Sequence, residues 1–339
     1  MGDPCGIGPE IIAKALAEPQ LQRAANYLIF GFSELFTYAA DVAELDLPWR
    51  RGHHEDLPQA APTSRRKRPR PAGPGGIVVL DYDELPAPLP ELHEPTHYGG
   101  RASLAFLEDA VRSAQSGLID AMVTAPISKV AWKMAGSRFP GHTELLAKRT
   151  KTKHYAMMFA SPTINVVLAT IHQSLSEVLS QLNVGSIFNP IELADQALRE
   201  LFGIENPHIA VAAINPHAGE EGRFGDDEKR VIAPAILMAA EAGINVTGPY
   251  PADTLFLRAS RGEFDCVIAM YHDQGMIPIK LLAFREAVNL TLGLPIIRTS
   301  PPHGTAFDIA GKNIADAEPM RAAIRLAIQL AQRKMQQQP

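Results

Sequence analysis

The sequence predicts an α/β fold with a mostly parallel sheet. Short runs rich in Val, Ile and Ala alternate with helical patterns along the whole 339-residue chain, which is typical of repeated strand–helix units. The runs contain few polar residues, as expected of strands that are buried on both faces. A chain of this length, with 46% hydrophobic and 20% charged residues, can bury one large core or two medium ones.

Three segments illustrate the pattern in chain order. Residues 9–17 are predicted to form a helix, because Pro9 suits a first helical turn and Glu10 complements its positive end. Residues 100–115 are predicted to form a second helix, whose buried face consists of Leu104, Leu107, Val111 and Ala114. Residues 118–124 follow it as a predicted buried strand.

The first ten residues contain a glycine-rich turn ahead of the predicted helix. Backbone N–H groups in such a turn can approach an anion closely. However, the Gly6-Ile-Gly8 pattern is not preceded by a strand, so it does not have the context of a dinucleotide-binding fingerprint. A tight turn at the start of a domain is the alternative interpretation.

Composition and charge exclude several classes of protein. No apolar run is long enough to span a bilayer, and the N-terminus has no signal-peptide pattern. Two cysteines, Cys5 and Cys266, are too few for a disulfide framework, so we expect a cytoplasmic protein. The net charge of −5 argues against broad nucleic-acid binding.

One internal segment, residues 62–76, is strongly basic. Five positive charges fall within residues 65–70 and are surrounded by prolines and glycines, which disfavour a helix or a central strand. We interpret the segment as a solvated loop. The alternative is an arm that binds nucleic acid or another anionic partner, but such arms usually extend from a chain end.

Three histidines each follow an apolar run: residues 164–170 precede His172, residues 209–214 precede His217, and residues 265–270 precede His272. Open α/β sheets bind ligands beyond the carboxyl ends of their strands. A single histidine there is more often a satisfied polar residue, but three at equivalent places indicate a shared ligand. Three imidazoles with an open fourth position are typical of a catalytic zinc-type site.

Several sequence blocks together resemble one known family, the 4-hydroxythreonine-4-phosphate dehydrogenases. They occur in the family's order along nearly the whole chain and are residues 2–10, 140–144, 215–220, 270–275 and 288–300. The resemblance implies an isocitrate/isopropylmalate dehydrogenase-like fold with two α/β domains around a central cleft. We expect residues 1–130 plus 281–339 to form the first domain and residues 131–280 to form the second, which would carry the metal ligands and the dimer interface.

The resemblance also implies roles for individual residues. It implies a divalent metal, most simply zinc with magnesium, manganese or cobalt as alternatives, held across a homodimer by His172, His217 and His272. It implies a substrate site made of His142, Thr143, Lys280, Asn289 and Arg298, of which the two cations suit a phosphate or carboxylate. A loop resembling the NAD site of the wider superfamily would supply His303, Gly304, Thr305, Asp308, Gly311 and Asn313, with NADP left open.

The activity implied is NAD- and metal-dependent oxidation of a small 3-hydroxy-4-phospho acid, such as 4-phosphohydroxy-L-threonine, followed by decarboxylation. A metal lowers the pKa of a bound hydroxyl and so favours loss of hydride to the nicotinamide. The sequence does not identify the proton acceptor, and Asp273 and Lys280 are the candidates because they lie near the ligand loop.

Two departures from the family pattern favour a related branch. Pro302 stands where the family usually has aspartate, and Ser128 stands where the biosynthetic enzymes tend to have histidine. That branch resembles dehydrogenases of 4-phospho-D-threonate and 4-phospho-D-erythronate, and a more distant branch acts on carboxylated cyclohexadiene diols. Outside this class, the alternatives are a three-histidine metallohydrolase and a metal-dependent binding protein without turnover.

Overall fold

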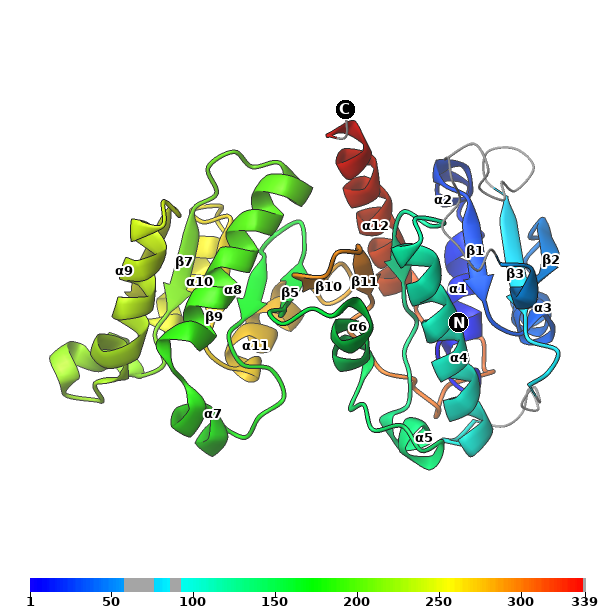
Figure 1. Ribbon diagram of the computed structural model, residues 1–339, viewed down its shortest axis with the longest axis horizontal. Helices are drawn as coiled ribbons and strands as arrows, with labels where there is room; N and C mark the ends of the chain where they lie inside the picture. Colours follow the sequence, from blue (N-terminus) through cyan, green and yellow to red (C-terminus); the bar gives the residue numbers. More distant parts are fainter. Residues whose placement is uncertain (58–75, 86–92, 338–339) are drawn as a thin grey trace. The chain divides into compact units, whose positions relative to one another are not determined.

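The computed structural model describes residues 1–57, 76–85 and 93–337, which form two compact units (Figure 1). Unit 1 contains Met1–Lys151 and Pro295–Ala331, and unit 2 contains Thr152–Leu294 and Gln332–Pro339. The units therefore change at residues 151 and 294, whereas the predicted domain boundaries lie near 130 and 280. The basic segment lies outside the described residues except for Gly76.

Unit 1 is built on a three-stranded parallel sheet with the order β1-β3-β2. The central strand β3 (Ile77–Asp81) is fully buried, and it lies between β1 (Tyr27–Phe30) and the half-exposed edge strand β2 (Trp49–His53). A second parallel pair in this unit joins β4 (Met122–Val123) to β11 (Arg298–Ser300).

The helices of unit 1 begin where the sequence provides suitable first turns. Proline occupies the first turn of α1, and the hydroxyls of Thr96 and Ser128 accept backbone N–H bonds at the starts of α4 and α5. The helices are α1 (Gly8–Leu16), α2 (Pro19–Ala24), α3 (Ser33–Val42), α4 (His97–Gln115), α5 (Lys129–Met134), α6 (His142–Thr150) and α12 (Glu318–Gln336), which runs on into unit 2.

The helix predictions for unit 1 agree with α1 and α4, but the strand predicted over residues 118–124 is shorter than expected. Only Met122 and Val123 are in a strand. The amides of Leu118 and Ile119 both donate to the carbonyl of Ser113 instead. The start of the apolar run thus closes the turn after α4 and cannot pair with a neighbouring strand.

Unit 2 contains a mixed sheet in which β10, β5, β6, β9, β7 and β8 follow one another. The last four strands are parallel neighbours, and β5 pairs antiparallel with both β10 and β6. The strands are β5 (Ala156–Ala160), β6 (Val166–Leu168), β7 (Ile209–Ala212), β8 (Val246–Tyr250), β9 (Cys266–Ala269) and β10 (Val288–Leu292). The predicted mostly parallel α/β fold is confirmed. Since only residues 161–165 join β5 to β6, no crossover helix fits between them and the pair is antiparallel.

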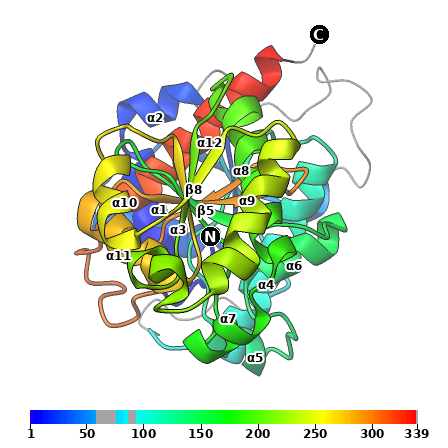
Figure 2. The same cartoon turned by 90° about the vertical axis from the view of Figure 1, so that its left-hand side faces the viewer.

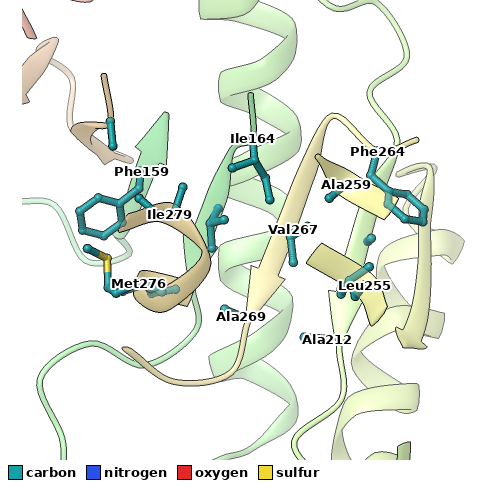
Figure 3. Close-up of a cluster of buried hydrophobic side chains, with 14 of the residues drawn as sticks. Phe159, Ile164, Ala212, Leu255, Ala259, Phe264, Val267, Ala269, Met276 and Ile279 are labelled. Carbon is teal, nitrogen blue, oxygen red and sulfur yellow. The ribbon is translucent and has the colours of Figure 1, made fainter. Parts of the chain in front are cut away.

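Helices cover both faces of the unit 2 sheet, with α10 (Ala252–Ala259) and α11 (His272–Ala283) on one side and α8 (Val184–Ala197) and α9 (Ala233–Glu241) on the other (Figure 2). Alternate residues of β6, β9 and β7 face the first side, where they pack against Leu255, Met276 and Ile279 (Figure 3). Because helices cover both faces of the sheet, both sets of alternate strand residues are buried, which explains why the strand runs in the sequence are almost wholly apolar.

The remaining elements of unit 2 are short: α7 (Leu175–Gln181), three irregular turns (Leu198–Phe202, Pro216–Gly222, Glu228–Ile232) and the end of α12. No helix in the described part of the chain is both long enough and apolar enough to span a membrane.

Candidate functional site

The three predicted metal ligands follow three neighbouring parallel strands of unit 2. β9 lies between β6 and β7, and the segments that carry His172, His272 and His217 leave the carboxyl ends of β6, β9 and β7 respectively. Parallel strands end at the same edge of a sheet, so all three imidazoles belong to that edge. The strand predictions on which this placement rested are confirmed.

Two of these histidines lie close together. The ring centroids of His172 and His272 are 5.8 Å apart. His272 begins α11, and its Nδ1 lies 2.7 Å from Oδ1 of Asp273. A metal-binding histidine usually donates its other ring N–H to a carboxylate in this way, which leaves Nε2 for the ion.

His217 lies in an unusual loop at the same edge. Residues 217–221 all have positive φ angles, and four of these five are not glycine. The carboxylate of Glu228 holds the start of the loop, because its Oε1 accepts the backbone N–H groups of Ile214 at 2.9 Å and Asn215 at 2.7 Å. Within the described residues of one chain, the three histidines do not form a single cluster of donor atoms within 4.8 Å.

Two further predicted substrate residues belong to unit 2. Lys280 is exposed on α11, eight residues after His272, which corresponds to about 12 Å along the helix. Asn289 lies on β10, and its Oδ1 is buried without a hydrogen-bond partner. A buried acceptor without a partner is costly, so this amide oxygen is suited to a donor on a ligand.

Arg298 is the buried cation of unit 1. Its side chain is 3% exposed on β11, and its Nε and Nη2 donate to Thr124 Oγ1 at 3.1 Å and 2.7 Å. Burial lowers the pKa of Arg298 to about 10, and the nearby Glu144 opposes that effect. The guanidinium therefore stays charged at neutral pH in a place where its charge is poorly solvated.

His142 and Thr143 form the start of α6 in the same unit. Burial, and then the positive charge of Arg298, hold the pKa of His142 well below its usual range. A neutral imidazole thus lies near the buried guanidinium, and Thr143 is buried beside it in the first helical turn. Backbone N–H groups at a helix start add to the positive character of this region.

The predicted cofactor loop borders an open pocket of about 420 Å³ in unit 1. Of its six predicted residues, Gly311 and Asn313 line this pocket. Gly311 has a φ of +70°, and a Cβ there would lie 2.6 Å from Nε2 of His93. The pocket therefore needs glycine at this position, both for the backbone conformation and for space.

The other four predicted cofactor residues lie along the same loop. The Thr305 carbonyl accepts the Ile7 amide at 3.0 Å, which ties the loop to the N-terminal turn. Asp308 and Gly304 are exposed. Nδ1 of His303 lies 3.0 Å from the Gly304 carbonyl, and its Nε2 is buried without a partner.

Sequence reasoning missed most of the pocket's lining. Apolar and aromatic residues of α3 form one wall, and Gly6 and Glu10 of the N-terminal turn form another; the α3 residues are Leu35, Tyr38, Ala39 and Val42. The glycine-rich turn was a visible signal, whereas α3 has only the pattern of an ordinary core helix. Glu10 also positions the loop, since its Oε1 accepts the Ala315 amide at 2.8 Å.

The chain is similar along nearly its whole length to known proteins of one family. The family model of the pyridoxal phosphate biosynthetic protein PdxA matches residues 23–327. A 4-hydroxythreonine-4-phosphate dehydrogenase of Desulfosudis oleivorans is 47% identical, covering 98% of this chain and 94% of the relative. A D-threonate 4-phosphate dehydrogenase of Salmonella typhimurium is 42% identical, with coverage of 98% and 97%. The crystal structure of a 4-hydroxythreonine-4-phosphate dehydrogenase from Klebsiella pneumoniae matches with a TM-score of 0.82 at 40% identity, with coverage of 98% and 96%.

Proposed function

The chain belongs to the family of the pyridoxal phosphate biosynthetic protein PdxA, and from that premise we propose that it is an NAD-dependent, decarboxylating dehydrogenase of a small phosphorylated hydroxy acid. The observation that carries the proposal is the buried Arg298, a guanidinium that is 3% exposed. A buried cation of this kind is suited to an anionic group of a ligand, because arginine binds phosphate or carboxylate with two parallel hydrogen bonds.

The side chains around Arg298 favour an anion that carries hydroxyl groups. Since His142 has a lowered pKa, it is neutral at pH 7 and can either donate or accept one hydrogen bond. Thr143, next along the chain, is the second predicted contact. We assign these three residues to substrate binding, together with Asn289 and Lys280 of unit 2.

The pocket beside Gly311 fits the adenosine half of NAD. Its apolar wall on α3 can pack against a planar base, and Gly311 presents no side chain to the pocket. We assign His303, Gly304, Thr305, Asp308, Gly311 and Asn313 to the cofactor, of which Asp308 offers a carboxylate for ribose hydroxyls. NAD bound there would accept the hydride, and a divalent metal held by His172, His217 and His272, which we propose to be zinc, would stabilise negative charge on the substrate oxygens.

We assign the metal to His172, His217 and His272. The donor set is neutral nitrogen, which suits zinc. The contact from Asp273 to Nδ1 of His272 leaves Nε2 of that ring available. Because Asp273 orients a proposed ligand, Lys280 becomes the more suitable of the two proposed proton acceptors.

We further propose that two chains share each site in a homodimer. An exposed apolar stripe on α11, formed by Ile277, Leu281 and Phe284, supports this. These positions share one helical face, and the same helix begins at His272. The stripe starts five residues after His272, so a second copy that covers it could extend to the metal-binding edge and contribute a ligand there. Both cysteines are free thiols, in keeping with the predicted cytoplasmic location.

Formation of NADH in a substrate panel tests the proposal. We expect turnover with 4-phosphohydroxy-L-threonine or with D-threonate 4-phosphate, accompanied by release of one carbon dioxide per NADH. The panel should include D-erythronate 4-phosphate and a carboxylated cyclohexadiene diol. Release of inorganic phosphate without NADH would instead support the hydrolase, and metal binding without any turnover would support the binding protein.

The D-threonate branch is a specific second candidate. Ser128 replaces the histidine expected of the biosynthetic enzymes, and its hydroxyl is occupied as the cap of α5, where it accepts the Ala131 amide at 3.1 Å. A higher kcat/KM for D-threonate 4-phosphate than for 4-phosphohydroxy-L-threonine would decide in favour of that branch.

A further inference from the structure

A second group of metal-binding side chains lies in unit 1 and consists of His54, Glu55 and Glu84. One ligand atom from each residue lies within 4.8 Å of the others. His54 and Glu55 belong to the turn after the edge strand β2, and Glu84 follows β3. Since β2 and β3 are parallel neighbours, their carboxyl ends bring the three side chains together. We propose that these residues bind a divalent metal cation, for which Zn²⁺ is the best fit.

The environment of His54 fixes which ring nitrogen faces the cluster. Nδ1 lies 3.1 Å from Oδ2 of the buried Asp109, and the Tyr82 hydroxyl lies 2.9 Å from the same oxygen. In that contact the Tyr82 hydroxyl is the donor, and a carboxylate oxygen can only accept. Asp109 is therefore the acceptor in both contacts, and Nδ1 of His54 carries the hydrogen. The lone pair of a neutral imidazole is then on Nε2.

Packing holds the ring in that orientation. The ring of Tyr82 stacks on His54 with centroids 4.1 Å apart and an interplanar angle of 9°. A carboxylate on one ring nitrogen with the other nitrogen left for an ion is the usual arrangement of a metal-binding histidine. The exposed Glu55 and Glu84 side chains can adjust to an ion, whereas His54 is already positioned.

The contact between His54 and Glu84 has the geometry of two ligands rather than of a hydrogen bond. Nε2 lies 2.9 Å from Glu84 Oε1, yet this buried nitrogen has no hydrogen-bond partner. The carboxylate oxygen therefore lies off the axis along which a ring N–H would point. Two atoms that each lie about 2.1 Å from one zinc ion, at about 90–110° to each other, are about 3.0–3.4 Å apart and lie off axis in the same way.

The local charge also favours a cation. Five carboxylates gather at this end of the sheet, and the arginines paired with them are Arg51 and Arg112. The carboxylates belong to Glu55, Asp81, Asp83, Glu84 and Asp109. The carboxylates here outnumber these arginines by three. One imidazole nitrogen with two carboxylate oxygens is a donor set that zinc accepts.

Equilibrium dialysis of Zn²⁺ against the chelator-stripped full chain tests the proposal. We expect the unaltered protein to bind one more ion per chain than Glu84→Gln, a change that keeps the size of an exposed side chain. His54→Gln should lose the same ion. The matched control is Asp56→Asn, which removes one charge from the same turn outside the proposed ligand set and should keep the ion. Zn²⁺ should also raise the Tm of the unaltered protein more than that of Glu84→Gln.

Two results would overturn the proposal. Equal Zn²⁺ stoichiometry in the unaltered protein and Glu84→Gln would remove the site. Loss of the same ion in Asp56→Asn would mean that an acidic surface attracts cations without a defined site. The NADH assay on Glu84→Gln should change less than twofold, and the difference in ion count stands whether or not the chain is a dehydrogenase.

Discussion

Replacing Arg298 by methionine should separate binding from stability. Burial lowers the pKa of Arg298 from the usual arginine range to about 10 in the folded protein, a difference that corresponds to about 3 kcal/mol. The folded chain keeps this proton only to about pH 10 and the unfolded chain keeps it to a higher pH, so the cost of the buried charge is fully present at pH 7. The folded protein without ligand therefore holds a charge at the expense of its own stability.

The methionine variant relieves that cost and loses the hydrogen bonds of the guanidinium, of which the two to Thr124 are together worth about 1–3 kcal/mol. We expect the free energy of unfolding in urea to change by less than about 1 kcal/mol, because the two effects oppose each other. In contrast, kcat/KM from NADH absorbance should fall by about 100-fold or more, since the substrate anion loses its charged partner.

The matched control is Arg325→Met, which removes a half-exposed arginine of α12 that pairs with Glu18 and Glu318. It should change both measurements little. A loss of more than about 2 kcal/mol of stability in Arg298→Met, or a fall in its kcat/KM of less than tenfold, would refute the view that Arg298 binds the substrate anion at a cost to stability. Equal losses of affinity for phosphorylated and unphosphorylated substrates would assign Arg298 to the carboxylate instead of the phosphate.

Three further predictions concern the histidines and the pocket. Below pH 6.5 the unfolded chain gains a proton on His142 that the folded chain does not take up, so the free energy of unfolding should decrease as the pH is lowered, by up to about 1.4 kcal/mol per pH unit. Urea titrations at several pH values should show a weaker pH dependence of stability for His142→Gln. An identical pH dependence in both proteins would contradict the lowered pKa. Gly311→Val should raise the KM for NAD at least tenfold because of the contact with His93, whereas Gly136→Val, at a similar φ of +80° but with nothing within 4 Å of a Cβ, should not; equal effects would place the cofactor elsewhere. Single alanine variants of His172, His217 and His272 can be mixed in three pairs. If two chains share each metal site, two of these three mixtures should regain activity, up to about half per hybrid dimer. Lack of activity in all three mixtures after proven subunit exchange would exclude shared sites.

The sequence was sufficient to predict those parts of the molecule that depend on local pattern. The runs before His172 and His272 are strands because their composition suits burial on both faces, and the edge at which the histidines lie follows from parallel pairing alone. The α/β class and the helices α1 and α4 were predictable for the same reason.

Features that depend on distant segments were not predictable from pattern. Thr124 fixes the guanidinium of Arg298 from 174 residues away, and no local signal marks it. The α3 residues that line the pocket at Gly311 were not predictable for the same reason, because they lie near Gly311 only in the folded chain. The strand predicted over residues 118–124 was too long for a different reason. The backbone N–H groups of Leu118 and Ile119 donate to the carbonyl of Ser113 and are not available to a neighbouring strand.

The left-handed loop at His217 has a consequence for how this protein would change under selection. Each non-glycine residue in that conformation costs about 1 kcal/mol relative to glycine, and Ala218, Glu220 and Glu221 all adopt it. A laboratory population selected only for heat resistance should therefore accumulate glycine at these three positions. If His217 binds the metal as proposed, the same changes would also loosen the loop that carries it, so the most heat-resistant clones would be poorer catalysts. In the loop at residues 217–221, thermal stability and turnover would then favour different residues.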